Sequence, residues 1–348
     1  MPSNKHSNMH LNRLLGILLG IFMANGLFAQ DIHFTQYNMS PMTLNPGLIG
    51  GFEGTARVGG IYRNQWSSVI DNEFVTPSFW VDAPIIRGFR KKDWVGVGVM
   101  FLSDEAGSVG FEQNSVKFGA SYHFALDKGG NTYLTLGAQG GRLEQKIDNA
   151  RFQFEDKLLL NDPMAMSSDP FAAAQSGKGF DLDAGVVLKS RLNKRMDVTL
   201  GFSMYHLLEP EISLFEGGTG DKKQARRPVF TGVYNVELTD RWTFSPSFLF
   251  QTRSGNDEII VQGMGNYLFD PEKDISFDLG LGYRLGDALS VMGGVRWKDL
   301  RVGLAYDINT SDLNTVSNSR GGFEIAANYI FKIFKEADVD PQILCPRF

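Results

Sequence analysis

The feature that most constrains this chain is a long series of segments in which apolar and polar residues alternate. The series begins near Glu53 and continues to the C-terminal region. Side chains of a strand point alternately to opposite faces, so a period of two predicts strands. No window of comparable length shows a helical apolar stripe. In Leu300–Ile308, one face carries Val302, Leu304, Tyr306 and Ile308, and the other carries Arg301, Gly303, Ala305 and Asp307.

About fourteen segments follow this pattern, and most reach the ~9–11 residues that a tilted strand needs to cross a bilayer. Twelve or sixteen strands are also compatible with the sequence. The predicted strands are Glu53–Arg63, Phe74–Asp82, Trp94–Leu102, Phe111–Phe124, Asn131–Lys146, Gly179–Lys189, Arg195–His206, Pro228–Leu238, Arg241–Gln251, Asp257–Tyr267, Asp274–Arg284, Ala288–Trp297, Leu300–Ile308 and Gly322–Ile333.

A soluble β-sandwich and a membrane β-barrel share this period, but other features favour the barrel. Sandwich strands are commonly about five to six residues long, and they bury their aromatic side chains. Here the strands are longer, their polar faces are rich in Gly and Ser, and aromatic residues gather near strand ends. We therefore predict an all-β fold, a single antiparallel barrel of the outer-membrane type. Arg301, Asp307 and Glu324 should face its lumen, and Val302, Leu304 and Ile325 should face lipid.

The connections between predicted strands alternate in length, although Leu285–Asp287 and Ala83–Asp93 break the rule. Outer-membrane barrels have short periplasmic turns and longer external loops. If the first strand rises from the periplasm, the odd-numbered connections lie outside. The long ones are Asn64–Glu73, Ile147–Lys178, Leu207–Arg227 and Asn309–Gly321, and the short even-numbered ones include Asp127–Gly130, Thr239–Asp240 and Lys298–Asp299.

The N-terminal region has the pattern of an export signal. Lys5 and Arg13 precede an apolar run, Leu14–Met23, which is about half the ~20 residues of a spanning helix. Cleavage is expected after Ala29. The predicted organisation is a signal peptide at 1–29, a periplasmic leader or plug segment at 30–52, the barrel at 53–333 and a C-terminal tail at 334–348. The expected location is the cell outer membrane.

The sequence contains no motif that predicts catalysis, a cofactor or a metal site. His206 and Glu209 have a metal-ligand spacing, but they lie at a strand end, and a solvated rim explains them better. We therefore predict no enzyme and no cofactor. The net charge of −5 disfavours a nucleic-acid partner. Cys345 is the single cysteine, so no disulfide forms within the chain.

Two groups of residues allow alternative interpretations. The pairs Gly96/Gly98, Gly263/Gly265 and Gly280/Gly282 fall at strand spacing, where glycine leaves room in the lumen wall or permits bending. The basic clusters Arg87–Lys92 and Arg191–Arg195 fall in predicted periplasmic connections. They suit solvated turns, and the alternative is a docking point for an acidic periplasmic partner.

Short patches spread over nearly the whole chain resemble the PorP/SprF family of the type IX secretion system. One patch departs from the family, because Gly-Gly-Phe-Glu-Ile at 321–325 replaces a Gly-Ser-His-Glu-Ile-like sequence. The matching patches are Asp31, Phe34, Gln36-Tyr37, Asn45-Pro46-Gly47, Arg63-Asn64-Gln65-Trp66, Pro77, Asp82, Pro84, Gly96-Val97-Gly98, Asp169-Pro170-Phe171, Tyr283-Arg284, Tyr306-Asp307, Gly322-Phe323-Glu324-Ile325 and Cys345-Pro346-Arg347-Phe348.

This resemblance implies an outer-membrane barrel that supports the export or surface anchoring of large cargo, such as gliding adhesins. It implies as partners the periplasmic ring or peptidoglycan-binding subunits of the machine, a secreted adhesin or other cargo, and outer-membrane lipid. A passive porin or small-solute transporter is the alternative. The candidate residues for contacting partners or filling the barrel are Gln36, Tyr37, Asn45, Pro46, Cys345, Pro346 and Phe348.

Overall fold

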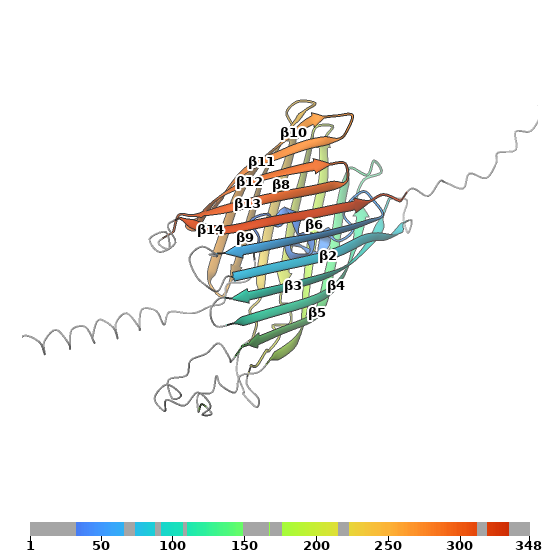
Figure 1. The fold of residues 1–348 in the computed structure, drawn as a ribbon. Helices are drawn as coiled ribbons and strands as arrows, with labels where there is room; N and C mark the ends of the chain where they lie inside the picture. Colours follow the sequence, from blue (N-terminus) through green and yellow to red (C-terminus); the bar gives the residue numbers. More distant parts are fainter. Residues whose placement is uncertain are drawn as a thin grey trace, which may run out of the picture. The chain divides into compact units, whose positions relative to one another are not determined.

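The computed structural model describes residues 33–65, 74–87, 92–106, 110–148, 167, 176–214, 223–311 and 319–333. Fourteen antiparallel strands close into a barrel in which β1 pairs with β14 (Figure 1). This confirms the predicted fold and decides the strand count. The strands are β1 (Ala56–Gln65), β2 (Phe74–Arg87), β3 (Trp94–Ala106), β4 (Phe111–Ala125), β5 (Thr132–Ile147), β6 (Gly177–Asn193), β7 (Met196–Tyr205), β8 (Arg227–Glu237), β9 (Trp242–Arg253), β10 (Asn256–Asp270), β11 (Ile275–Arg284), β12 (Ala288–Trp297), β13 (Leu300–Asn309) and β14 (Arg320–Phe331).

The two faces of each strand differ as a membrane barrel requires. On β11, Leu279 is 71% exposed and Leu281 is 60% exposed, whereas Asp278 and Arg284 are buried. Large apolar side chains therefore cover the outside, where lipid replaces water, and polar ones face inward. On β13, Leu304 is exposed and Asp307 is buried, so the predicted register of this strand is confirmed.

The two ends of the barrel differ in their connections. One end, called here the turn end, carries the connections that follow β2, β4, β6, β8, β10 and β12, which are at most six residues long. The other, called the loop end, carries the remaining ones, including the long segments after β5 and β7. The outer-membrane rule assigns the turn end to the periplasm. No helix in the described part of the chain has the length and apolar character that crossing a membrane requires.

Residues 33–52 lie inside the barrel, and this segment is called the plug (Figure 1). It contains three short helical turns: η1 (Tyr37–Met39), α2 (Pro41–Leu44) and η2 (Pro46–Leu48). The last two turns each begin with proline, whose fixed φ suits the first position of a helical turn. Turns this short satisfy few backbone N–H and C=O groups with hydrogen bonds of their own. Side chains of the barrel wall therefore supply many of the remaining partners.

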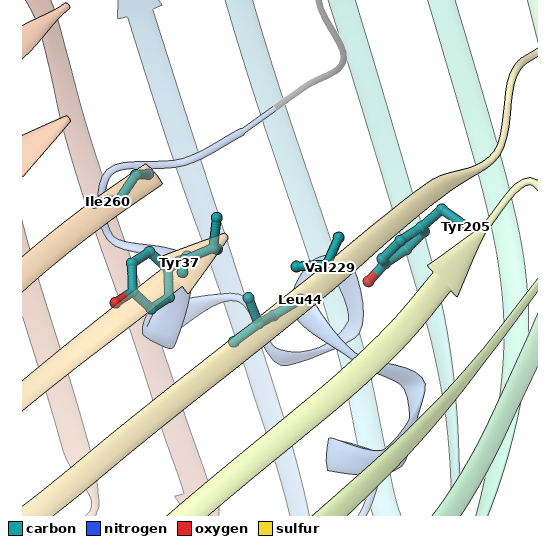
Figure 2. Packing of buried hydrophobic residues seen from close by; sticks show 6 residues of the cluster. Tyr37, Leu44, Tyr205, Val229 and Ile260 are labelled. Atoms are coloured by element: carbon teal, nitrogen blue, oxygen red, sulfur yellow. The ribbon is translucent and has the colours of Figure 1, made fainter. Parts of the chain in front are cut away.

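One apolar cluster of the barrel lies between the plug and the strands from β7 to β10. Tyr37 and Leu44 of the plug pack against inward-facing residues from β7 to β10 (Figure 2). These wall residues, Tyr205, Val229, Leu249 and Ile260, are all at most 4% exposed. Apolar burial of this kind helps to hold the plug against the wall, and Met42 and Ile49, which are fully buried, add to it near β3 and β4.

Candidate functional site

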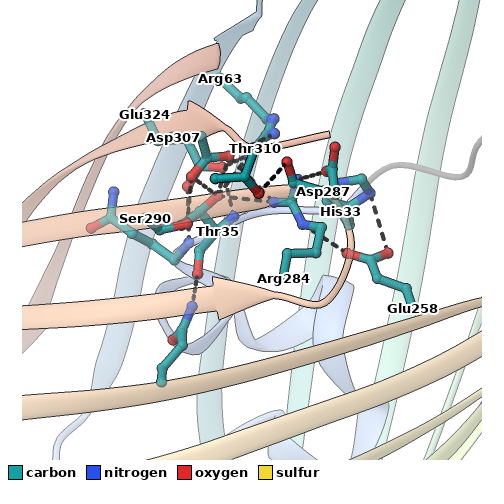
Figure 3. A network of polar contacts seen from close by, with 12 residues as sticks. His33, Thr35, Arg63, Glu258, Arg284, Asp287, Ser290, Asp307, Thr310 and Glu324 are labelled. Atoms are coloured by element: carbon teal, nitrogen blue, oxygen red, sulfur yellow. Dashed lines mark hydrogen bonds and ion pairs between the residues drawn. The ribbon is translucent and has the colours of Figure 1, made fainter. Parts of the chain in front are cut away.

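A cluster of buried charges near the loop end holds the start of the plug (Figure 3). Glu324 on β14 accepts hydrogen bonds from the backbone N–H of Thr35, at 2.6 Å, and of Gln36, at 2.9 Å. Asp307 on β13 accepts one from the Thr35 hydroxyl at 2.8 Å. Arg63 on β1 forms ion pairs with both carboxylates. Carboxylates of the barrel wall thus accept hydrogen bonds from the start of the plug.

These charges are almost completely removed from solvent, which requires that they be paired. Arg63 is 2% exposed and Glu324 is 1% exposed. Arg284 on β11 adds a second guanidinium, with its Nη2 atom 3.3 Å from Asp307 Oδ2. Arg284 also pairs with Glu258 at 3.1 Å and with Asp287 at 2.7 Å, so each charge around Thr35 has a partner of opposite sign. Removing one member would leave an uncompensated buried charge.

His33 lies beside this cluster, with its Nδ1 atom 3.6 Å from Glu258 Oε2. Burial lowers the pKa of His33 from 6.5 to about 4. The carboxylate of Glu258 acts in the opposite direction, and the guanidinium groups of Arg284 and Arg63 add to the lowering. The imidazole is therefore neutral at physiological pH.

The Asn45-Pro46-Gly47 turn rests on a recess formed by two glycines. Gly137 on β5 and Gly185 on β6 are cross-strand partners, and both face the lumen. A Cβ atom on Gly137 would lie 2.4 Å from the Pro46 carbonyl, and one on Gly185 would lie 2.0 Å from Asn45 Oδ1. Only glycine permits so close an approach of the two backbones.

Asn45 uses both ends of its amide to fix this turn. Its oxygen accepts a hydrogen bond from the Gly47 N–H at 2.8 Å. Its Nδ2 atom donates to the carbonyl oxygens of Val186, at 3.2 Å, and Phe202, at 3.1 Å. The second contact crosses from β6 to β7. One side chain therefore connects the plug to two strands.

A third set of contacts holds the plug near the turn end. Asp82 on β2 accepts a hydrogen bond from the Gly50 N–H at 2.8 Å and pairs with Arg57 at 2.7 Å. Trp94 on β3 donates from its indole nitrogen to the Gly50 carbonyl at 2.9 Å. Gly96 gives room here, since a Cβ atom on it would lie 2.3 Å from the Ile49 carbonyl oxygen. This glycine, as predicted, leaves space in the lumen wall.

A cluster on β4, β6 and the start of the β7–β8 connection contains possible metal ligands. Asp181, Asp183 and His206 bring their donor atoms within 4.8 Å of one another. The ammonium of Lys117, however, lies 2.6 Å from each carboxylate and takes the position of a cation. Glu209 points elsewhere and pairs with Arg226 at 3.5 Å. The cluster is best described as a buried ion-pair network that links β4, β6 and the β7–β8 connection.

On the turn-end side of the plug, the lumen contains a polar cavity of about 620 Å³, called here the vestibule. Asn38 of the plug lines it, together with the turn-end halves of the strands from β6 to β13. Its charged lining residues are five cations and three acids. They are Arg191, Lys194, Arg195, Arg296, Arg301, Asp197, Glu237 and Asp278.

The predicted site residues separate into two groups. Gln36, Tyr37, Asn45 and Pro46 are buried in the plug and contact the wall. Tyr37, for example, shares a hydrogen bond of 2.8 Å with Ser247 on β9. Partner binding by these residues stays a prediction. The others, Cys345, Pro346 and Phe348, lie outside the described residues.

The sequence placed Asp307 and Glu324 in the lumen, but it did not show that these wall residues and Asp82 hold the plug. Asp82, Asp307 and Glu324 stand at lumen-facing positions, where alternation alone predicts only a polar side chain. A usable signal was present. Charged residues in the middle of a membrane strand are costly unless they are paired, so each required a buried partner.

Comparison with known proteins gives a match to one family. The family model described as type IX secretion system membrane protein PorP/SprF matches residues 27–329. No curated protein matches the chain.

Several solved barrels share parts of the fold at low identity. The toluene transporter TbuX of Ralstonia pickettii is 10% identical, with a TM-score of 0.49, over 83% of this chain and 93% of its own. A Pseudomonas aeruginosa FadL homologue is 11% identical, with a TM-score of 0.47, over 82% and 93%. The KdgM porin is 9% identical, with a TM-score of 0.38, over 79% and 99%. Likeness at this level gives no reason to assign a transport activity. The family match covers most of the chain, and the chain belongs to the PorP/SprF family of type IX secretion system membrane proteins.

Proposed function

We propose that this barrel acts in type IX secretion as a binding and anchoring component, without chemical turnover. It would support the export or surface attachment of large cargo proteins, such as gliding adhesins. Its partners would be the periplasmic ring or peptidoglycan-binding subunits and the cargo itself. The family and the fold are non-enzymatic in kind, which agrees with a role in binding.

The observation that supports this proposal most strongly is the fixed plug. Three separate sets of buried polar contacts hold residues 33–52 against the wall, and apolar packing adds a fourth. Passage of a large polypeptide through the lumen would require all four to break. A protein that binds cargo or machine subunits at its two ends needs no such rearrangement.

The proposal is tested by deleting the whole gene and measuring two outputs, surface display of cargo and uptake of small solutes. We expect cargo display to fall while solute uptake is unchanged. A complementing copy that carries the wild-type chain should restore display. The reverse pattern, lost uptake with normal display, would support the passive porin instead. A pull-down from native membranes would then identify the cargo and the periplasmic subunits.

We further propose that the tail supplies partner contacts, because it follows the last strand and the barrel closes without it. Deleting residues 337–348 should leave a folded barrel but reduce delivery or surface retention of cargo. Folding is checked by heat-modifiable migration on gels. Normal cargo display by the truncated chain would exclude a role for Cys345, Pro346 and Phe348.

A further inference from the structure

We infer that the vestibule is a binding site for an acidic, extended polypeptide segment of a periplasmic partner. The inference rests on the turn end facing the periplasm, and it names the chemistry of one partner of the proposed function. The volume, about 620 Å³, is within the ~300–1,000 Å³ range of ligand pockets. The cavity ends at Asn38 of the plug, so a segment that enters from the turn end stops there.

Two guanidinium groups of the vestibule, which flank the β12–β13 turn, share one carboxylate. Arg296 and Arg301 are directly opposite each other on β12 and β13, and both line the cavity. Like charges in this position repel. Asp278 forms an ion pair of 3.1 Å with Arg301. Within the part of the chain that the structure describes, no carboxylate lies within ion-pair distance of Arg296. A second carboxylate, supplied by a ligand, would give each of the two guanidinium groups an ion-pair partner.

Two of the three acids of the lining are already engaged by amide groups. Asp197 accepts a hydrogen bond of 2.8 Å from the amide of Asn235. Asp278 accepts one of 2.6 Å from Asn266, in addition to its pair with Arg301. The lining as a whole has five cationic and three acidic side chains. An anion that enters therefore meets a net positive field, which also raises the rate of encounter.

The uncharged lining favours a peptide over a single small anion. Thr243, Ser245 and Ser247 project from one face of β9, and with a rise of ~3.3 Å per residue they extend over about 13 Å. Amides and hydroxyls both donate and accept, as a peptide backbone requires. The basic cluster Arg191–Arg195, for which the sequence left open a docking point as the alternative to a solvated turn, contributes to the rim of this cavity. Peptide side chains with carboxylates would then reach cations on two separate parts of the lining, at the β6–β7 turn and at the β12–β13 turn.

The test measures binding of a fluorescein-labelled heptapeptide of Glu, Ser and Gly to the purified full-length barrel in detergent by fluorescence anisotropy. We expect saturable binding, and no binding of the matched peptide in which Gln replaces Glu. Arg296→Gln should weaken binding about tenfold, the size expected for losing one charge-assisted hydrogen-bond pair. The matched control is Lys128→Gln, which removes an exposed cation at the same end but outside the cavity, and it should bind normally.

Three results would overturn the inference. In the first, the Gln peptide binds with the same affinity as the Glu peptide. In the second, Arg296→Gln and Lys128→Gln have the same affinity for the Glu peptide. In the third, inorganic phosphate displaces the peptide when the two are present at equal concentrations of negative charge. The last result would indicate a general anion site. Heat-modifiable migration shows that each variant is folded, and Arg191→Gln with Lys194→Gln gives an independent variant at the rim. Because cargo display does not enter this assay, failure here and failure of the proposed function are distinguishable.

Discussion

At the scale of single residues, the plug depends on positions where the wall has no side chain. The recess under Asn45 exists because β5 and β6 place Gly137 and Gly185 opposite each other. The sequence predicted that lumen-facing glycines leave room in the wall. It could not tell what fills that room, because alternation describes one strand at a time and not the contents of the barrel.

Gly185→Ala should therefore destabilise the barrel. The new Cβ atom would lie 2.0 Å from Asn45 Oδ1, so the turn must move or its hydrogen bonds must break. Overpacking of this kind costs about 1–3 kcal/mol. Denaturant unfolding in liposomes measures the loss. The matched control is Gly293→Ala, where the nearest atom is 3.9 Å away. An equal loss of unfolding free energy in the two variants would mean that the recess does not contribute to holding the Asn45 turn.

His33 makes the stability of the plug dependent on pH. Its pKa is about 4 in the folded chain, below the ordinary value of 6.5. The unfolded chain therefore binds the proton more tightly, and acid favours unfolding. The contribution of neutral His33 is complete above about pH 6.5 and is lost as the pH falls toward 4. Unfolding midpoints measured across this window should fall with pH, and less so in His33→Gln. An unchanged slope in the variant would contradict the assignment.

At the scale of the strand, alternation was a strong guide. The predicted strands overlap the observed ones throughout, and the boundaries differ mainly where a strand extends beyond its apolar stripe. β3, for example, runs to Ala106, past the predicted Leu102, because Ser103, Asp104 and Glu105 continue the pairing with β4. Ladder hydrogen bonds come from the backbone, so a strand can continue past the point where lipid contact ends.

Leu304 is 47% exposed on the lipid-facing side of β13. A charged substitution there should strongly reduce the free energy of folding. Leu304→Arg should cost roughly 2–4 kcal/mol in liposome folding, the value for arginine near the bilayer midplane. Ala305, the next residue of β13, faces the lumen and is the adjacent position for comparison. Ala305 is only 3% exposed, so an arginine there would be overpacked. Ser245→Arg, which enters the vestibule, is the better control, and equal losses at Leu304 and Ser245 would refute the assigned faces.

At the scale of the whole molecule, residues 33–52 of the leader form part of the interior of the barrel. Its proline and glycine turns were visible in the sequence, as were the lumen-facing charges Asp307 and Glu324. Their contact was not, because it joins residues almost three hundred positions apart. The vestibule was missed for the same reason, since eight strands and the plug line it together.

The measurement that most directly tests the fixed plug is conductance of the purified barrel in planar bilayers, compared with a variant that lacks residues 33–50. Heat-modifiable migration on gels confirms that each chain is folded. If the plug occupies the lumen as its buried contacts indicate, the full-length chain should pass little current, and the deletion should open a stable pore. A full-length chain that conducts as well as the deletion variant would contradict a fixed plug and would favour a passive porin.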